Sequence, residues 1–269
     1  MGQVGHVRDQ VVWVTGASSG IGRELAVQFA ELGARVVLTA RREEALRETQ
    51  QRCPDPSRTA LVQADLSLLE ELDGIVDRAI GAFGRIDIAV LNAGVSQRGV
   101  AVETDPDVVR FVNSVNFLSP AHITRRLVPH MLQRGAGRIV AVSSLSTRVP
   151  TPYRSSYTAS KAALETYMTV LRRELVGSGV GVTLALPGFV RTNISRAALN
   201  ADGSTHGVLD PAQENGMAPE ACAQRILAGI RRGRREILMP SDMRTRLGLF
   251  LQRRAPGLLD RMMARAKVT

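Results

Sequence analysis

A glycine-rich turn between an apolar run and a helical pattern constrains the fold of this chain more than any other feature. Residues 11–15 are apolar or β-branched, as in a buried strand, and residues 23–32 have helical periodicity. The turn between them, TGASSGIG at residues 15–22, carries glycines at positions 16, 20 and 22. Such glycines allow a sharp turn and a close approach to a pyrophosphate, which the amino end of the helix attracts. The alternative interpretation is a turn with a structural role only.

Strand-like and helix-like segments alternate along most of the chain. The strands are expected at residues 11–15, 34–39, 59–63, 86–91, 137–143, 180–186 and 236–239. The helices are expected at residues 23–32, 43–52, 68–83, 106–134, 156–178 and 219–231. This alternation predicts an α/β fold: a single Rossmann-type doubly wound parallel sheet of about seven strands, with helices on both faces. We expect residues 1–240 to form one dinucleotide-binding and catalytic domain, with a lid at about 189–217, and residues 241–269 to form a helical C-terminal extension.

Composition narrows the class of protein and its location. The chain has 269 residues, a formal net charge of +10 and two cysteines, Cys53 and Cys222, which are not spaced as metal ligands. The four histidines are dispersed, so we expect no metal site. No apolar run is long enough for a transmembrane segment, and residues 1–10 lack the apolar region of a signal peptide. These features predict a cytoplasmic protein. The arginines are spread along the chain and no nucleic-acid recognition motif is present, so we expect no nucleic-acid partner.

The residues after the second expected strand predict which nicotinamide cofactor binds. Dinucleotide-binding folds that take NAD place a carboxylate there, to hold the hydroxyls of the adenosine ribose. This chain has Ala40, Arg41 and Arg42 instead. A guanidinium can hold a 2′-phosphate through paired hydrogen bonds, so the sequence favours NADP(H) over NAD(H). The alternative is that both arginines are solvated charges at the start of a helix.

A tyrosine and a lysine form a candidate acid–base pair. Tyr157 and Lys161 are four residues apart in a helical pattern, and such residues share one helix face. A nearby positive charge favours the phenolate, so Tyr157 could exchange a proton closer to neutral pH. Ser144 follows an apolar run and could hold a substrate oxygen against the tyrosine. The alternative for an isolated Tyr-x-x-x-Lys pattern is a pair of surface residues.

Several polar or small residues follow expected strands directly. Ligands in doubly wound sheets bind beyond the carboxyl ends of the strands, and these residues should meet at that edge. They are Gly16, Asp65, Asn92, Ser144 and Pro187. Asn116 lies within an expected helix, where it could also be a capping or packing residue.

These motifs together resemble the short-chain dehydrogenase/reductase family over about residues 11–239. The resemblance rests on TGASSGIG, Asn92-Ala93-Gly94, Asn116, Ser144, Tyr157 with Lys161, and Pro187-Gly188 followed by Thr192. The helical tail resembles, more narrowly, the dehydrogenase/reductase member 7 branch. The family resemblance implies a catalytic set of Asn116, Ser144, Tyr157 and Lys161. It implies a cofactor site formed by Gly16, Ser18, Ser19, Gly20, Ile21, Gly22, Arg41, Arg42, Asp65, Leu66, Asn92, Ala93, Gly94, Tyr157, Lys161, Pro187, Gly188, Val190 and Thr192.

The resemblance also assigns roles to individual residues. Tyr157 gives its proton to the substrate oxygen, Ser144 positions that oxygen, and Lys161 lowers the pKa of Tyr157 and holds the nicotinamide ribose. Asn116 fixes a water that links Lys161 to solvent. Asp65 meets the adenine, Asn92 the ribose side and Thr192 the carboxamide.

The expected activity is hydride transfer between NADP(H) and a ketone, aldehyde or secondary alcohol, with a homodimer or homotetramer as the expected assembly. The pocket walls, residues 145–153 and Phe189, are mostly apolar and suit a hydrophobic steroid-like, retinoid-like or aryl substrate; a 3-ketoacyl thioester is the main alternative. A catalytically silent NADP(H)-binding regulator or scaffold is the alternative function. The arginine-rich tail either packs on the protein or makes peripheral membrane contact.

Overall fold

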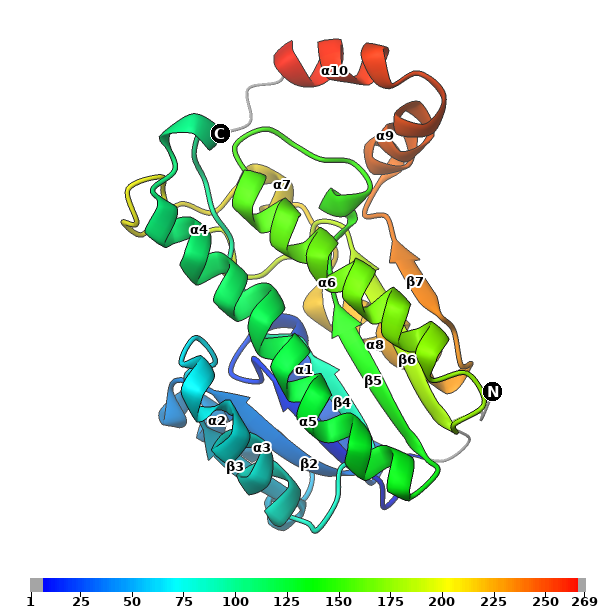
Figure 1. The fold of residues 1–269 in the computed structure, drawn as a ribbon. Helices are drawn as coiled ribbons and strands as arrows, with labels where there is room; N and C mark the ends of the chain where they lie inside the picture. Colours follow the sequence, from blue (N-terminus) through cyan, green and yellow to red (C-terminus); the bar gives the residue numbers. More distant parts are fainter. Residues whose placement is uncertain (1–6, 266–269) are drawn as a thin grey trace.

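A parallel sheet of seven strands forms the centre of the protein, whose residues 7–265 are described by a computed structural model (Figure 1). The strands are β1 (Val11–Thr15), β2 (Arg35–Ala40), β3 (Thr59–Gln63), β4 (Ile88–Leu91), β5 (Gly137–Val142), β6 (Val180–Pro187) and β7 (Glu236–Met239). They lie in the order β3-β2-β1-β4-β5-β6-β7, and every neighbouring pair is parallel. The order reverses beside β1, where doubly wound folds bind their ligands. The predicted fold class is therefore confirmed.

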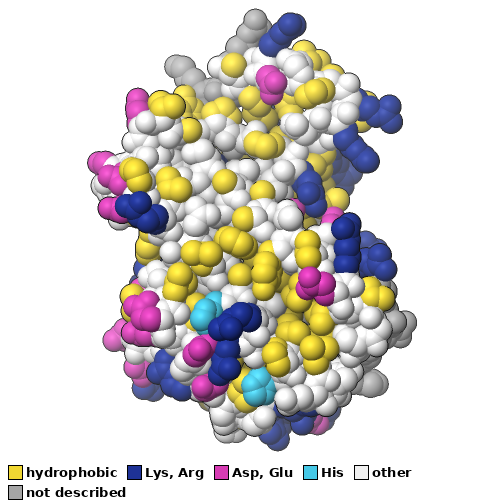
Figure 2. Space-filling model, viewed as in Figure 1, with side chains coloured by type: hydrophobic (Ala, Val, Ile, Leu, Met, Phe, Trp, Pro, Cys, Tyr) yellow, Lys and Arg dark blue, Asp and Glu magenta, His cyan; other side chains and the backbone are white. Residues whose placement is uncertain are grey.

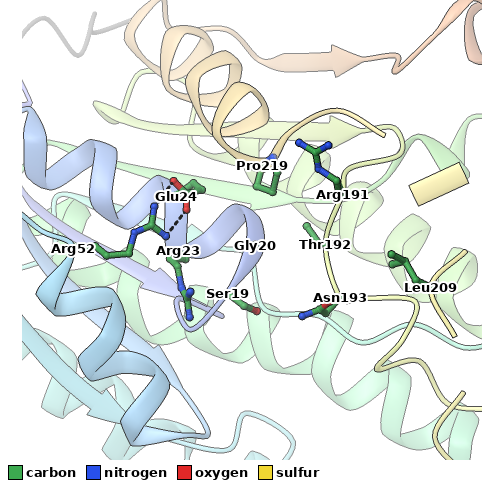
Figure 3. Close-up of a pocket in the computed structure, with 10 residues that line it drawn as sticks. All are labelled: Ser19, Gly20, Arg23, Glu24, Arg52, Arg191, Thr192, Asn193, Leu209 and Pro219. Carbon is green, nitrogen blue, oxygen red and sulfur yellow. Dashed lines mark hydrogen bonds and ion pairs between the residues drawn. The ribbon is translucent and has the colours of Figure 1, made fainter. Parts of the chain in front are cut away.

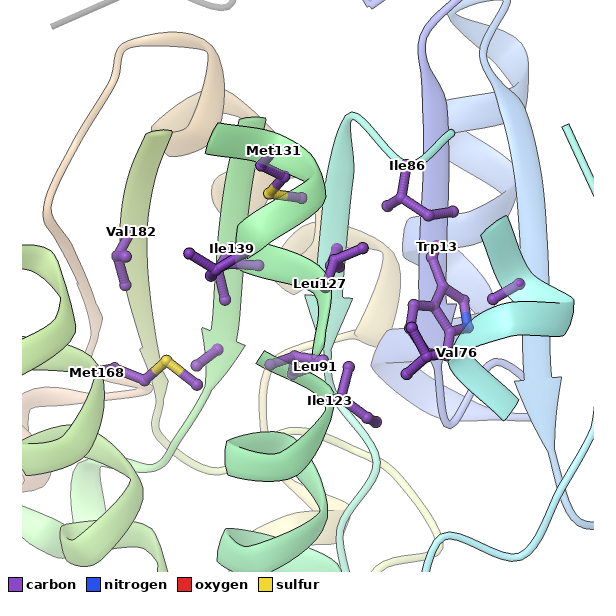
Figure 4. Close-up of a cluster of buried hydrophobic side chains, with 14 of the residues drawn as sticks. Trp13, Val76, Ile86, Leu91, Ile123, Leu127, Met131, Ile139, Met168 and Val182 are labelled. Atoms are coloured by element: carbon purple, nitrogen blue, oxygen red, sulfur yellow. The ribbon is translucent and has the colours of Figure 1, made fainter. Parts of the chain in front are cut away.

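Helices cover both faces of the sheet. They are α1 (Gly20–Glu31), α2 (Glu43–Gln51), α3 (Leu72–Gly81), α4 (Pro106–Asn113), α5 (Ser119–Gln133), α6 (Ser155–Glu174), α7 (Pro211–Glu214), α8 (Pro219–Arg231), α9 (Met243–Arg254) and α10 (Pro256–Arg265). Strand residues alternate between the faces, as the period of two requires. Val11 and Trp13 pack under α3, α5 and α6, whereas Val12 and Val14 pack under α1, α2 and α8. Figure 4 shows the first of these two cores.

The expected helix over residues 106–134 is interrupted by a π-helical turn, Ser114–Leu118, between α4 and α5. The N–H of Ser119 bonds to the carbonyl of Ser114, five residues earlier. Pro120 follows and has no N–H to donate to the carbonyl of Asn116, so an ordinary helical turn cannot be completed there. Such wide turns occur frequently at functional sites. The interruption places Asn116 on the buried side of the helix, facing the end of β4.

The helix that carries Tyr157 and Lys161 is shorter than predicted. The periodicity indicated residues 156–178, but α6 ends at Glu174. Gly177 and Gly179 both have positive φ angles, of 85° and 81°. Glycine adopts this conformation at little cost, and it ends the helix and turns the chain into β6.

The C-terminal segment forms two helices, α9 and α10, beyond the carboxyl edge of the sheet (Figure 1). Their buried residues Leu251 and Leu259 cluster with Val149 of the loop that precedes α6. The extension therefore covers one side of the loop that carries the expected substrate-pocket walls. No described helix is long and apolar enough to cross a membrane.

Candidate active site

The glycine turn brings the end of β1, the start of α1 and the end of β4 into close contact. Gly16 and Gly20 have φ angles of +67° and +55°, which favour glycine. A Cβ atom on Gly22 would lie 2.2 Å from the carbonyl oxygen of Gly16 and 2.4 Å from Nδ2 of Asn92. That Nδ2 donates to the carbonyl of Thr15 at 3.1 Å and so ties the turn to β4. The turn forms a cradle that has no room for larger side chains, as a closely approaching pyrophosphate requires.

A cleft of about 230 Å³ opens between the start of α1 and the segment that follows β6 (Figure 3). Ser19, Gly20 and Arg23 line it from α1, and Arg191, Thr192 and Asn193 line it from the opposite side. Ser19 is the N-cap of α1 and its side chain makes no capping hydrogen bond, so no side chain caps the amino end of the helix. Arginines and a helix N-terminus are together suited to phosphate groups. The residues present therefore fit the phosphates of a dinucleotide.

The expected adenosine side lies at the ends of β2 and β3. Arg41 and Arg42 are exposed there, and within residues 7–264 neither guanidinium forms an ion pair. Asp65 accepts hydrogen bonds from the N–H and the hydroxyl of Ser67, and Leu66 beside it is buried. Ala93 donates its N–H to the Thr15 hydroxyl at 3.1 Å. The predicted residues thus share one edge of the sheet, with both arginines free to bind an anion.

Tyr157, Ser144 and Lys161 are brought together by the first turns of α6 and the end of β5. Burial raises the pKa of the Tyr157 phenol, and a hydrogen bond with the Ser144 side chain acts in the opposite sense. The Lys161 ammonium donates to the carbonyl of Val142 at 2.9 Å. Burial lowers the pKa of Lys161 to about 8, while the negative charge of Glu165 opposes that shift. The pKa of Tyr157 therefore lies above its ordinary value, contrary to the expectation from the sequence, whereas the pKa of Lys161 lies closer to neutral. A buried phenol and a buried amine on one helix face suit proton transfer.

Asn116 holds the segment that follows β4. Its Oδ1 accepts from the N–H of Val95, and its Nδ2 donates to the carbonyl of Val95 and the hydroxyl of Ser160, all at 2.9 Å. A Cβ on Gly94 would lie 3.2 Å from both Asn116 Oδ1 and Lys161 Nζ. Asn116 and Lys161 therefore adjoin the same glycine. The Asn116 side chain therefore holds Val95 and Ser160 together, which is one of the roles considered from the sequence.

Glu165 lies one helical turn beyond Lys161 and holds the loop that follows β5. Its Oε1 accepts hydrogen bonds from Ser143 at 2.5 Å and Thr147 at 2.6 Å, and Arg148 pairs with its other oxygen at 3.1 Å. These bonds fix the loop that carries Ser144. This buried carboxylate was not among the predicted site residues, although its spacing from Lys161 places both on one helix face.

The segment after β6 lies over the site and is held by backbone pairing. Gly188 donates its N–H to the carbonyl of Met239 at 2.9 Å, and Val190 forms a β-bridge with Met217. Thr192 packs against the start of α1: a Cβ on Gly20 would lie 2.9 Å from its methyl group. Pro187 is the last residue of β6. These predicted positions follow β6 at the carboxyl edge of the sheet, and Thr192 contacts the glycine turn.

A buried cluster of charges beside Tyr157 was only partly predicted. Arg154, which directly follows the expected pocket walls at residues 145–153, was given no role, and Arg98 and Asp210 were not predicted. Both guanidiniums bind one oxygen of Asp210, at 2.6 Å and 2.8 Å. No sequence pattern links Arg98 to Asp210 across 112 positions. The one feature of the sequence that could have suggested this pair is that both charged residues lie in segments that follow strands.

Comparison with known proteins now identifies the family. The family model for short chain dehydrogenases matches residues 10–202. The chain belongs to the short-chain dehydrogenase/reductase family. It is therefore an oxidoreductase of that family, as the resemblance of its motifs implied.

Individual relatives agree with this membership. The chain is 38% identical over 266 residues to dehydrogenase/reductase SDR family member 7B of Bos taurus, covering 96% of this chain and 82% of that protein. A short-chain dehydrogenase/reductase from Burkholderia phymatum in complex with NAD has a TM-score of 0.82 at 26% identity and 96% coverage of both chains. A short-chain dehydrogenase from Sphingobium yanoikuyae in complex with NADPH has a TM-score of 0.75 at 27% identity and the same coverage. These neighbours support a nicotinamide cofactor.

Proposed function

We propose that this protein is an NADP(H)-dependent oxidoreductase that interconverts a hydrophobic ketone or aldehyde and the corresponding alcohol. The observation that carries the proposal is the grouping of the buried Tyr157 and Lys161 with the half-buried Ser144, on the same sheet edge as the glycine cradle. A bound nicotinamide supplies the hydride chemistry. The alternative, a silent NADP(H)-binding scaffold, would not need a buried phenol and amine at this edge, since burying such groups is costly.

In the proposed mechanism, the chain's residues orient the substrate and move a proton. Tyr157 donates its phenolic proton to the substrate oxygen during reduction, and Ser144 holds that oxygen by a hydrogen bond. Lys161 binds the nicotinamide ribose and, with Asn116, belongs to the path that returns the proton to Tyr157. Donors already aimed at the developing oxyanion stabilise it without reorganisation, which is where such sites gain most of their rate.

We propose the remaining cofactor contacts from where the predicted residues lie along the carboxyl edge of the sheet. The glycine turn, with Ser18, Ser19 and Ile21, would hold the pyrophosphate. Asp65 and Leu66 would border the adenine, and Asn92, Ala93 and Gly94 the ribose. Pro187, Gly188, Val190 and Thr192 would border the nicotinamide, with residues 189–217 acting as a lid. The free and buried Cys53 and Cys222 fit the cytoplasmic location that we also propose.

Removal of both guanidiniums after β2 should abolish the preference for NADP(H). We expect the parent to bind NADPH more tightly than NADH in calorimetric titrations, because no carboxylate among the described residues competes for Arg41 and Arg42. The double substitution Arg41→Ala and Arg42→Ala should weaken NADPH binding about tenfold or more, since a hydrogen bond to a charged group contributes about 1.5–3 kcal/mol. NADH binding should change little. Arg47→Ala, in the helix that follows these arginines and paired with Glu43, is the matched control. A parent that prefers NADH would overturn the cofactor assignment.

We propose that two copies associate through the face of α5 and α6. Leu118, Leu132 and Val170 are 41%, 43% and 45% exposed there, and Figure 2 shows apolar side chains across this face. Such patches are typical of interfaces. Size-exclusion chromatography with light scattering should therefore give a dimer or tetramer mass. Val170→Glu should lower that mass, whereas Val176→Glu, 81% exposed beyond the end of α6, should not. A monomeric parent would contradict the proposal.

A further inference from the structure

Three segments distant in the sequence meet at a buried ionic cluster of Arg98, Arg154 and Asp210, named here the arginine–aspartate cluster. Arg98 follows β4, Arg154 precedes α6 and Asp210 comes from the segment after β6. Arg98 binds Asp210 Oδ2 through Nη2 at 2.6 Å and Nε at 3.2 Å, and Arg154 Nη2 binds the same oxygen at 2.8 Å. The three side chains are at most 10% exposed.

The charges in the arginine–aspartate cluster do not balance. Two guanidiniums share one carboxylate, which leaves one excess positive charge in a buried place. His206 also lies against Asp210, with Nε2 at 3.8 Å from Oδ1. Arg98 Nη1 also donates to the hydroxyl of Ser96 and the carbonyl of Gln97, which are neutral. Burying an unbalanced charge is costly, so its retention calls for a group that benefits from it.

That group is Tyr157. Arg154 is the N-cap of α6, three residues before the tyrosine, and its carbonyl accepts the N–H of Thr158 at 2.9 Å. The positive charges of Arg154 and Arg98 act on the buried phenol and lower its pKa, against the effect of burial. On the same helix, the Lys161 ammonium is bonded to the carbonyl of Val142, and the charge of Glu165 acts on Lys161.

We propose that Arg98, Arg154 and Asp210 are positioning residues that set the electrostatic field at Tyr157, their one excess positive charge stabilising the deprotonated phenol oxygen. This inference rests on the proposed function, in which Tyr157 is the proton donor. It assigns to two arginines part of the role that the family resemblance gives to the lysine. The segment after β6 also becomes part of the active site. It supplies the Asp210 carboxylate, which limits the excess positive charge of the arginine–aspartate cluster to one.

The charge count makes a test possible that needs neither substrate nor cofactor. The chain has three tyrosines, so Tyr153→Phe and Tyr167→Phe together leave Tyr157 as the one phenol. Its ionisation is then followed by tyrosinate absorbance as the pH rises, with circular dichroism recording where the protein unfolds. Tyr157→Phe in the same background supplies the blank.

In this background the ionisation midpoint should follow the net charge of the cluster. Asp210→Asn leaves two excess charges and should lower the midpoint by roughly one pH unit or more. Arg98→Met leaves none and should raise it, while Arg154 still pairs with Asp210. The double variant Arg98→Met with Asp210→Asn restores one excess charge and should return the midpoint close to that of the parent. Arg196→Met, an exposed arginine in the same segment, is the control and should have no effect.

A purely structural role predicts a different order. Each single variant would then move the midpoint in the same direction, and the double variant would lie further from the parent than either; that order would overturn the proposal. Where alkaline unfolding hides the transition of the parent, Asp210→Asn is compared with the double variant, and a midpoint in Asp210→Asn equal to or above that of the double variant would overturn the proposal. The proposed function is judged separately, by the turnover of Tyr157→Phe, so the two can fail independently.

Discussion

Tyr157→Phe is expected to lower kcat by about 10²–10⁴-fold, the range that general acid catalysis contributes. The substitution removes one hydroxyl from a buried side chain and leaves the ring, so the packing of α6 should persist. Ser144 would lose a hydrogen-bonding partner but remain in place, because its Oγ also accepts the N–H of Ser146 at 3.1 Å. Turnover is measured by NADPH absorbance against a panel of hydrophobic ketones and aldehydes, including a 3-ketoacyl thioester.

The control for this substitution is Tyr167→Phe. Tyr167 lies on the same helix, and its hydroxyl makes one long hydrogen bond of 3.4 Å to the carbonyl of Ala121. We expect unchanged turnover in that variant and unchanged NADPH affinity in both. Near-normal kcat in Tyr157→Phe would remove the tyrosine from the chemistry. A parent that binds NADPH but reduces no member of the panel would favour the scaffold alternative.

Gly22→Ala is expected to have the largest effect on cofactor binding. The added methyl would lie 2.2 Å from the Gly16 carbonyl oxygen and 2.4 Å from Asn92 Nδ2, and the first of these atoms is backbone that cannot move aside alone. Overpacking typically costs about 1–3 kcal/mol, and here it would displace the turn that is expected to contact the pyrophosphate. Calorimetry should therefore show NADPH affinity reduced by well over tenfold, and thermal unfolding should show a lower Tm.

Gly74→Ala is the matched control, because it makes the same chemical change inside α3. A Cβ there meets no atom within 4 Å, and its φ angle is not positive. Alanine is favoured over glycine inside a helix by about 0.5–1 kcal/mol, so this variant should be as stable as the parent or slightly more so. Equal NADPH affinity in the Gly22 and Gly74 variants would show that the turn does not form the cofactor cradle.

The fold could be predicted because its determinants are local. Residues 11–15 and 20–31 form a strand and a helix from an apolar run, a periodicity and a glycine turn, all visible within twenty residues. Burial on both faces explains why β1 is a continuous apolar run, and β2 and β4 flank it in parallel. The convergence of Asn92, Ser144 and Pro187 follows in turn, because the carboxyl ends of parallel strands share one edge.

What the sequence did not show depends on contacts that only tertiary packing creates. Asn116 reaches the segment after β4 because a π-helical turn faces its side chain toward Val95. Pro120 was the one local feature of the sequence that indicated such a turn. The pairing of Arg98 with Asp210 was beyond prediction, since an irregular segment carries the aspartate and nothing in its periodicity fixes where it folds back. Glu165 looked like one of many helix-surface carboxylates, yet it is 5% exposed.

The burial of Trp13 gives the protein a built-in optical probe. It is the chain's one tryptophan, it is fully buried in β1, and its indole N–H donates to the Thr39 hydroxyl at 2.8 Å. Thr39 lies two residues before Arg41, and Trp13 lies three before the first glycine of the turn. Indole emission overlaps the absorption band of a reduced nicotinamide, so resonance energy transfer from this single donor would report occupancy of the cradle in the unmodified chain.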